Sequence, residues 1–242
     1  MYLIQKKILL CELFCVLCVF QIFISNARTL INGVAAENNF ADVGFVWIFM
    51  VRKKVLYLDG CVRGDRSQTR KLAEAYLDML EKRIDADIEK IMLDTLPLAC
   101  LNSEKLEWRN KCVETGDFSD AYFDHARKIA DKHILIIAVP YWDLSFPAML
   151  KLFCEQICIN NLTFAYQNDG RILKMNKLEK VVYITTAGGY IGENNFGFEY
   201  IRGLFKNIFQ VDDFEFYSAE GLDIVSTDAE KTLKETQSRF AL

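Results

Sequence analysis

The sequence predicts an α/β protein built around one doubly wound parallel sheet with helices on both faces. Short, uninterrupted apolar runs recur along the chain, and such runs are typical of strands buried on both faces. They alternate with amphipathic segments of helical period, as right-handed crossover connections require. The chain has 242 residues and is 52% hydrophobic, which is enough apolar material for one such core.

The first half of the sheet comes from three apolar runs, namely residues 55–58, 88–93 and 133–139. The first run ends at Asp59 and Gly60, and the third is stopped by Pro140. Between the first two runs, Ser67 can cap a helix whose apolar side chains recur at helical spacing. A loop follows the second run, and residues 117–132 are predicted to form an amphipathic helix.

The second half of the sheet comes from residues 180–186 and 212–219. Three helices are predicted around these strands, at residues 146–159, 195–209 and 227–239. Pro147 is tolerated there because the first turn of a helix needs no hydrogen bond from its N–H groups. Residues 162–173 are predicted to form a small hairpin that turns at Asn168-Asp169-Gly170.

Residues 1–49 are predicted to lie outside this domain, which then spans residues 50–242. Residues 8–24 are almost entirely apolar and follow a basic lead, as in a signal peptide. Three interpretations stay open: a cleaved signal for export, a membrane anchor, or translation that begins at Met50. We favour the third, because residues 54–59 already supply the first strand of a complete domain.

Composition argues against two classes of function. The net charge of −4 disfavours a nucleic-acid binder, which would more often be basic. Eight cysteines without a CxxC pair, together with only two histidines, disfavour a structural zinc site, and no metal is expected. The scattered cysteines favour reduced thiols in the cytoplasm. A membrane is expected as a partner only if residues 8–24 are an anchor.

Ligands of doubly wound sheets bind outside the carboxyl ends of the strands, so the loops there are the candidate site. The first loop, residues 59–69, contains neither GxxxxGK[ST] nor GxGxxG. It offers Arg63, the hydroxyl groups of Ser67 and Thr69, and free amides at a helix start. This combination is typical of a site for a phosphate monoester, although a capped helix without a ligand would also explain it.

The loops after the third and fourth strands add other properties. Tyr141 and Trp142 directly follow the third strand and offer a flat surface for a planar ring. Gly188 and Gly189 follow the fourth strand and let the backbone approach a ligand closely. Aromatic core packing and a plain turn would explain each feature alone. A phosphate cup, an aromatic wall and a glycine-rich floor at one sheet edge together suit flavin mononucleotide (FMN).

Residues 53 to about 224 resemble the flavodoxin-like, FMN-dependent NAD(P)H:quinone oxidoreductases and azoreductases. The resemblance rests on five blocks in register: VLYLDGCVRGDRSQTRKLAEAYL, ILIIAVPYWDLSFPAMLKLFCEQI, TFAYQNDG, VVYITTAGG and FYSAEGLD. It implies a five-stranded sheet of order 2-1-3-4-5. It also implies FMN as cofactor, NADH or NADPH as electron donor, and a quinone, azo compound or nitroaromatic as acceptor. The enzyme would be a homodimer with active sites at the subunit interface.

The loops and the family's motifs together nominate the cofactor-binding residues. These are Cys61, Arg63, Ser67, Gln68 and Thr69 in the first loop, Pro140, Tyr141, Trp142, Asp143 and Leu144 in the second, and Thr186, Ala187, Gly188 and Gly189 in the third. Amides of residues 141–144 and 186–189 would stabilise charge on the reduced ring. Tyr190 is the candidate catalytic residue and would cover the acceptor or donate a proton, while the flavin carries the redox chemistry.

Two positions depart from the family. Cys61 stands where a phosphate-binding serine is common, and a thiol is the weaker donor. Asp143 stands where an amide is common. Other functions also stay open: a flavodoxin-type electron carrier, and a hydrolase or a non-catalytic flavin-binding module on the same fold. Electron carriers are usually smaller and more acidic, and neither His125 nor His133 lies in a strand-end loop where a hydrolase would need it.

Overall fold

The computed structural model of the chain describes residues 52–240. The apolar segment at residues 8–24 and the candidate start at Met50 lie outside the described residues, so the domain boundary stays a prediction. Within residues 52–240, no helix combines the length and the hydropathy needed to cross a membrane.

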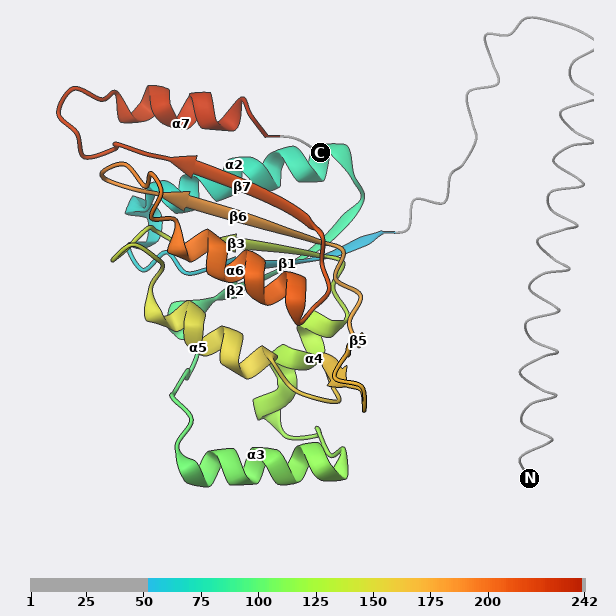
Figure 1. Ribbon diagram of the computed structural model, residues 1–242. Coiled ribbons are helices and arrows are strands. Elements are labelled where there is room, and N and C mark those ends of the chain that lie inside the picture. The colour runs from blue at the N-terminus through green and yellow to red at the C-terminus, as the bar shows by residue number, and fades with distance from the viewer. Residues whose placement is uncertain (1–51, 241–242) are drawn as a thin grey trace, which may run out of the picture. The chain divides into compact units, whose positions relative to one another are not determined.

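Five parallel strands form the central sheet, in the order β2-β1-β3-β6-β7 (Figure 1). Their bounds are β1 Lys53–Asp59, β2 Ala86–Met92, β3 Ile134–Ala138, β6 Lys180–Thr186 and β7 Asp213–Ala219. The hairpin strands β4 (Phe164–Tyr166) and β5 (Ile172–Lys174) pair antiparallel in a sheet of their own. The predicted hairpin is therefore confirmed, and so is the predicted strand order once the hairpin is set aside.

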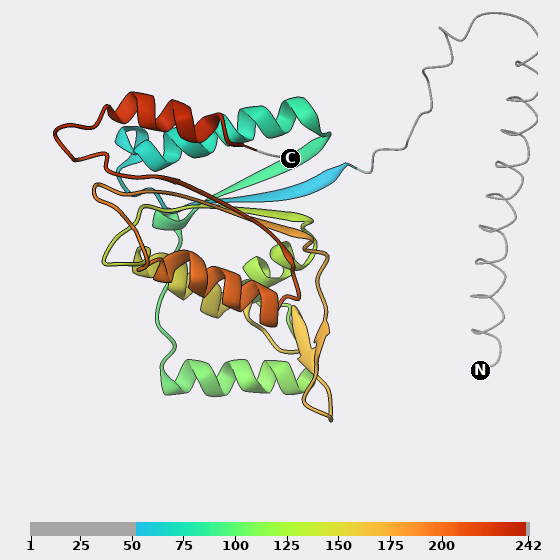
Figure 2. The ribbon, with the colours of Figure 1, turned by 45° about the horizontal axis from the view of Figure 1, so that its top comes forward.

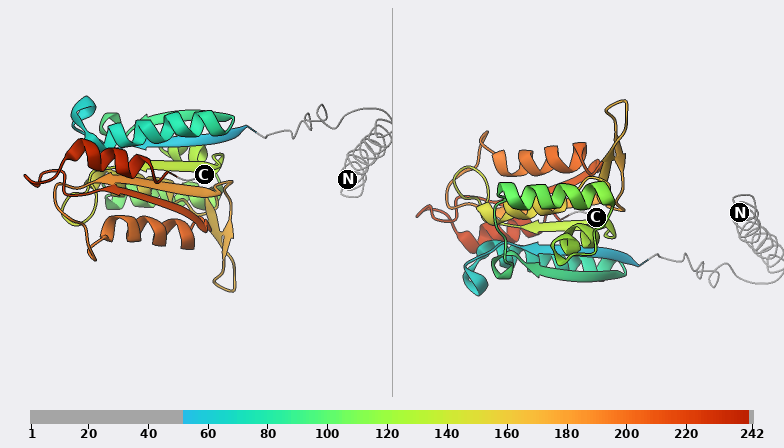
Figure 3. Two further views of the ribbon diagram at one scale, coloured as in Figure 1. Left: turned by 90° about the horizontal axis from the view of Figure 1, so that it is seen from above. Right: turned by 90° about the horizontal axis from the view of Figure 1, so that it is seen from below.

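Helices cover both faces of the sheet. Their bounds are α2 Gln68–Arg83, α3 Ser103–Thr115, α4 Asp124–Ala130, α5 Ala148–Ile157, α6 Phe196–Asn207 and α7 Ala229–Gln237. Helices α2 and α7 lie on one face, and α4, α5 and α6 lie on the other (Figures 2 and 3). Three short 3-10 helices join them: η1 Gly64–Arg66, η2 Leu93–Thr95 and η3 Ala121–Phe123.

The two faces of β1 belong to two separate hydrophobic cores. Leu56 and Leu58 pack with α5 and α6, whereas Val55 and Tyr57 pack with α2. These four side chains are at most 1% exposed. Strand β1 is therefore continuously apolar because it is buried on both faces, as a central parallel strand must be.

The helix prediction differs from the structure in three places. The predicted helix at residues 117–132 is instead η3 followed by the short α4, because Asp120 accepts the N–H of Tyr122 and ends the preceding loop there. Helix α3 was not predicted at all, and none of its residues is fully buried. Pro147 precedes α5 instead of lying in its first turn.

Candidate active site

The three candidate loops meet at the carboxyl edge of the sheet and enclose a cavity of about 280 Å³. Ligand pockets of proteins hold roughly 300–1,000 Å³, so this volume suits part of a small molecule. The cavity is lined by Cys61, Val62, Arg63, Arg66, Ser67, Gln68, Thr69, Pro140, Tyr141, Trp142, Thr186, Ala187, Gly188, Leu222 and Asp223.

Most of the nominated residues therefore lie together, but four do not line the cavity. These are Asp143, Leu144, Gly189 and Tyr190. Four further residues line the cavity that were not predicted from the sequence: Val62, Arg66, Leu222 and Asp223. Leu222 and Asp223 follow β7 at the same edge of the sheet, so the rule that ligands bind beyond the carboxyl ends of strands could have found them.

The first loop ends at the amino terminus of α2 and leaves donors free there. The Oγ of Ser67 accepts the N–H of Arg70 at 3.2 Å, and the Ser67 hydroxyl is also hydrogen-bonded to the thiol of Cys61. Within residues 52–240, the N–H groups of Gln68 and Thr69 have no hydrogen-bond partner. Arg63 and Arg66 are exposed, and no described residue pairs with either guanidinium. An anion at a helix amino terminus is stabilised by this arrangement.

Two nominated side chains in the first loop are committed to the protein instead. Cys61 donates its thiol proton to the carbonyl of Ala138 at 3.5 Å. Burial raises the pKa of this thiol to about 12, so it stays protonated at neutral pH. The fully buried hydroxyl of Thr69 lies 2.6 Å from that of Thr186 and joins the first loop to the third.

The second loop contains a tight turn with an unusual backbone. Trp142 and Ser145 exchange two backbone hydrogen bonds, at 2.8 and 3.1 Å. The φ angles of Asp143 and Leu144 between them are +50° and +64°. This left-handed pair is the hairpin turn that Asn and Gly favour, and a leucine in it is strained. Trp142 is 38% exposed, so its ring keeps a free surface at the cavity.

The third loop is held by the segment that follows β7. The N–H groups of Gly221, Leu222 and Asp223 donate to the carbonyls of residues 187–189, at 2.9 to 3.1 Å. A Cβ atom on Gly188 would lie 2.2 Å from Oδ2 of Asp223, whereas one on Gly189 would meet nothing within 4 Å. Gly188 thus makes room for Asp223, and only Gly189 leaves the open space expected of both glycines.

The expectation that amides of both loops face a ligand holds for some of them only. The N–H groups of Tyr141, Trp142 and Ala187 are used in hydrogen bonds to backbone carbonyls. In the described part of the chain, the N–H groups of Asp143, Leu144, Gly188 and Gly189 have no partner. No cluster of three or more metal-binding side chains occurs among residues 52–240.

Comparison with known proteins identifies relatives over nearly the whole domain. A family model described as a flavodoxin-like fold matches residues 53–241. The chain is 30% identical over 192 residues to FMN-dependent NADH:quinone oxidoreductase 2 of Clostridium acetobutylicum, a match that covers 76% of this chain and 94% of that protein. It is 32% identical over 181 residues to the FMN-dependent NADH:quinone oxidoreductase of Gluconobacter oxydans, covering 70% and 89%.

Solved structures share the same fold at lower identity. An azoreductase of Bacillus anthracis aligns with a TM-score of 0.68 at 16% identity, covering 77% of this chain and 95% of that one. An FMN-dependent NADH-azoreductase of the same species, solved in complex with FMN, aligns with a TM-score of 0.64 at 16% identity, covering 77% and 94%. At this identity the likeness concerns the fold alone.

Proposed function

This chain belongs to the protein family of the flavodoxin-like fold, and on that premise we propose that its cavity binds FMN for the two-electron reduction of quinones, azo compounds or nitroaromatics by NADH or NADPH. The protein is an FMN-dependent NAD(P)H oxidoreductase of the quinone reductase and azoreductase type. The observation that carries this conclusion is the 30% identity to the clostridial quinone reductase over 94% of that enzyme's length.

The free donors of the first loop fit the phosphate group of FMN. We assign the phosphate to the guanidinium groups of Arg63 and Arg66, the hydroxyl of Ser67 and the amides of Gln68 and Thr69. The two guanidinium groups and the two amides have protons that no described residue accepts, and the Ser67 hydroxyl would exchange its contact with the Cys61 thiol for one with the phosphate. Charge-assisted hydrogen bonds of this kind are about twice as strong as neutral ones. The thiol of Cys61 and the hydroxyl of Thr69 support the loop instead of donating to the phosphate.

The second and third loops provide the surroundings for a flavin ring. Bound FMN would supply the hydride and electron-transfer chemistry. Trp142 would cover one side of the ring and exclude water from it. The free amides of Asp143, Leu144, Gly188 and Gly189 are the donors left to stabilise negative charge on it.

Tyr190 stays our candidate for contact with the electron acceptor. Its side chain is 74% exposed and does not line the cavity. Its Cε1 atom would lie 3.4 Å from a Cβ atom added to Gly221, so the ring lies beside the segment that holds the third loop. An exposed phenol in this place is free to move over a bound acceptor or to donate a proton to it.

We also propose that the enzyme is a cytoplasmic homodimer. Support for a dimer comes from large apolar side chains that are exposed around the second and third loops: Trp142, Leu144, Tyr190 and Phe196. A surface of this kind marks an interface more often than it marks free surface. Support for the cytoplasm comes from the free thiols of all five cysteines in the described part of the chain.

The test of the proposed function is NADH oxidation by the purified protein with a quinone as acceptor. We expect NADH consumption that depends on both the quinone and FMN, and that stops when FMN is removed by dialysis and resumes when it is restored. A protein that retains FMN but does not oxidise NADH or NADPH, whichever acceptor is added, would contradict the proposal.

A further inference from the structure

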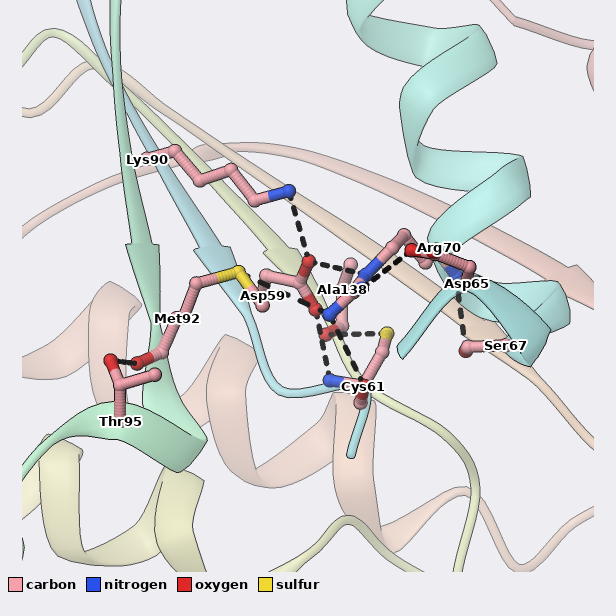
Figure 4. A network of polar contacts seen from close by, with 9 residues as sticks. All are labelled: Asp59, Cys61, Asp65, Ser67, Arg70, Lys90, Met92, Thr95 and Ala138. Atoms are coloured by element: carbon pink, nitrogen blue, oxygen red, sulfur yellow. Dashed lines mark hydrogen bonds and ion pairs between the residues drawn. The ribbon is translucent and has the colours of Figure 1, made fainter. Parts of the chain in front are cut away.

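A buried ion pair lies directly behind the proposed phosphate loop. Asp59 ends β1 and is completely buried. Its Oδ2 lies 2.8 Å from Nε of Arg70 and 3.2 Å from Nζ of Lys90, as Figure 4 shows. A buried carboxylate is tolerated only when such partners compensate its lost hydration.

The same two residues hold the backbone at the start of the loop. Oδ1 of Asp59 accepts the N–H of Cys61 at 3.0 Å, and Nη2 of Arg70 donates to the carbonyl of Cys61 at 3.3 Å (Figure 4). Asp59 and Arg70 therefore bind both the N–H and the carbonyl group of Cys61, from the side of the loop that faces the protein interior. No polar group of the cavity-facing residues Arg63, Arg66 and Gln68 is used for this purpose.

Arg70 also connects the loop to the first turn of α2. Its own N–H is capped by Ser67, and its Nη1 approaches Asp65 at 3.5 Å. The Arg70 side chain is only 9% exposed and does not line the cavity. Burial alone would lower the pKa of Arg70, but the interaction with Asp59 outweighs burial and raises this pKa. The Arg70 guanidinium is therefore charged at neutral pH.

We propose that Arg70, held by Asp59, is a positioning residue that shapes the loop at residues 61–67 for the phosphate of FMN. The inference rests on the proposed FMN site. A planar guanidinium forms an ion pair with the Asp59 carboxylate through Nε and donates to the Cys61 carbonyl through Nη2 at once, which a lysine ammonium cannot do in the same geometry. The loop is then arranged before the cofactor arrives, and preorganisation of this kind raises affinity by reducing the ordering that binding requires.

The test compares FMN with riboflavin, which has the same ring system but no phosphate. We expect Arg70→Gln to weaken FMN binding by roughly 10- to 100-fold, the effect of losing one charge-assisted contact. Riboflavin affinity should change less than about twofold, because riboflavin has no phosphate to bind in the loop at residues 61–67. Arg70→Lys keeps the charge and should lose most of the same FMN affinity. Arg83→Gln, at the exposed far end of α2, is the matched control and should change neither affinity.

A double variant keeps the test decisive if Arg70→Gln does not fold. Asp59→Asn with Arg70→Gln replaces the ion pair by two neutral side chains and leaves no buried charge unpaired. It should show the same selective loss for FMN. Equal losses for FMN and riboflavin, or an Arg70→Lys variant that binds FMN like the wild type, would overturn the inference while leaving the proposed function intact. A wild-type protein that binds neither compound would overturn the proposed function itself.

Discussion

Several residues of the candidate site support neighbouring loops and not the ligand directly. The missing side chain of Gly188 makes room for Asp223, and the hydroxyl of Thr69 bonds that of Thr186. The thiol of Cys61 bonds the main chain of β3. Each of these contacts joins segments that are far apart in the sequence, so the shape of the cavity depends on residues that a ligand need not touch.

Gly188→Ala should disturb the third loop, whereas Gly189→Ala should not. A Cβ at residue 188 would lie 2.2 Å from Oδ2 and 2.9 Å from Cγ of Asp223, so the Asp223 side chain must move. Because Asp223 is exposed and its side chain can turn away, the cost should be at the lower end of the range for overpacked cores, about 1 kcal/mol. Chemical denaturation of both variants without cofactor would measure the change in the free energy of unfolding, and FMN titration would measure the change in affinity. Equal effects of the two substitutions would mean that Asp223 yields without consequence.

Leu144→Gly should be tolerated far better than Leu173→Gly. Both leucines are 49% exposed, but only Leu144 has a positive φ, of +64°. Glycine relieves about 1–2 kcal/mol of left-handed strain at residue 144, which offsets its entropic cost of about 0.5–1 kcal/mol. Leu173 lies in strand β5 and has no such strain, so Leu173→Gly carries only the entropic cost. Urea denaturation should therefore show the Leu144→Gly protein to be at least about 1 kcal/mol more stable than the Leu173→Gly protein; the reverse order would refute strain at residue 144.

At the scale of elements, ion pairs and aromatic contacts attach the peripheral pieces to the sheet. Asp131, at the end of α4, forms an ion pair with Lys177, with 2.6 Å between Oδ1 and Nζ, and a second ion pair with Lys54 of β1. Helix α3 is attached differently, through Trp108, whose ring stacks on Phe123 at 5.7 Å between centroids. The first attachment depends on charge, and the second depends on apolar contact.

Stability should fall in acid partly through Asp131. Hydrogen bonds from Lys177 and then Lys54 lower the pKa of Asp131 to about 2. Because this folded-state pKa lies below the unfolded value of about 3.9, its contribution is present above about pH 4 and is lost as the pH falls toward 2. The contribution is small, since the side chain is 44% exposed. The difference in urea midpoint between wild type and Asp131→Asn should be constant above about pH 5 and shrink below pH 4; a difference independent of pH would rule this out.

Trp108→Ala should loosen α3 without affecting the cavity. Trp108 also meets Tyr122 edge-on at 5.4 Å, and it is the main aromatic side chain that α3 contributes to its small core. The loss of folding stability should be about 1–2 kcal/mol, which is less than the ~3–5 kcal/mol lost when a fully buried tryptophan is replaced by alanine. Hydrogen exchange should quicken in Ser103–Thr115 while FMN affinity stays unchanged. Leu106→Ala, on the exposed side of the same helix, is the control and should leave exchange unaffected.

At the scale of the whole molecule, the parallel sheet was the part most accessible from sequence. Each central strand is a short run of apolar residues, and β6 has the predicted bounds, Lys180–Thr186. Helix α3 escaped prediction because it has no buried stripe, and so lacks the apolar period that marks the other helices. It is held by contacts with η3, which local sequence does not reveal.

Most residues of the candidate site could be predicted from the sequence, but the contacts between their side chains could not. Strand ends and turn residues located the three loops, because these depend on local sequence and on sheet topology. The partners of Cys61, Thr69 and Gly188 were not predictable, since each lies on a different strand or loop. Asp223 could have been nominated from its place after β7, but the hydrogen bonds of its segment with residues 187–189 could not have been predicted.

The central claim is that this cavity holds FMN as the carrier of two electrons from NAD(P)H. Anaerobic titration of the purified, FMN-loaded protein with NADH tests it most directly, with the visible absorbance band of the oxidised flavin as the signal. We predict that about one equivalent of NADH per bound FMN bleaches this band completely, and that added quinone restores it. A protein that does not retain FMN, or whose bound FMN keeps its full absorbance in excess NADH and NADPH, would contradict this claim.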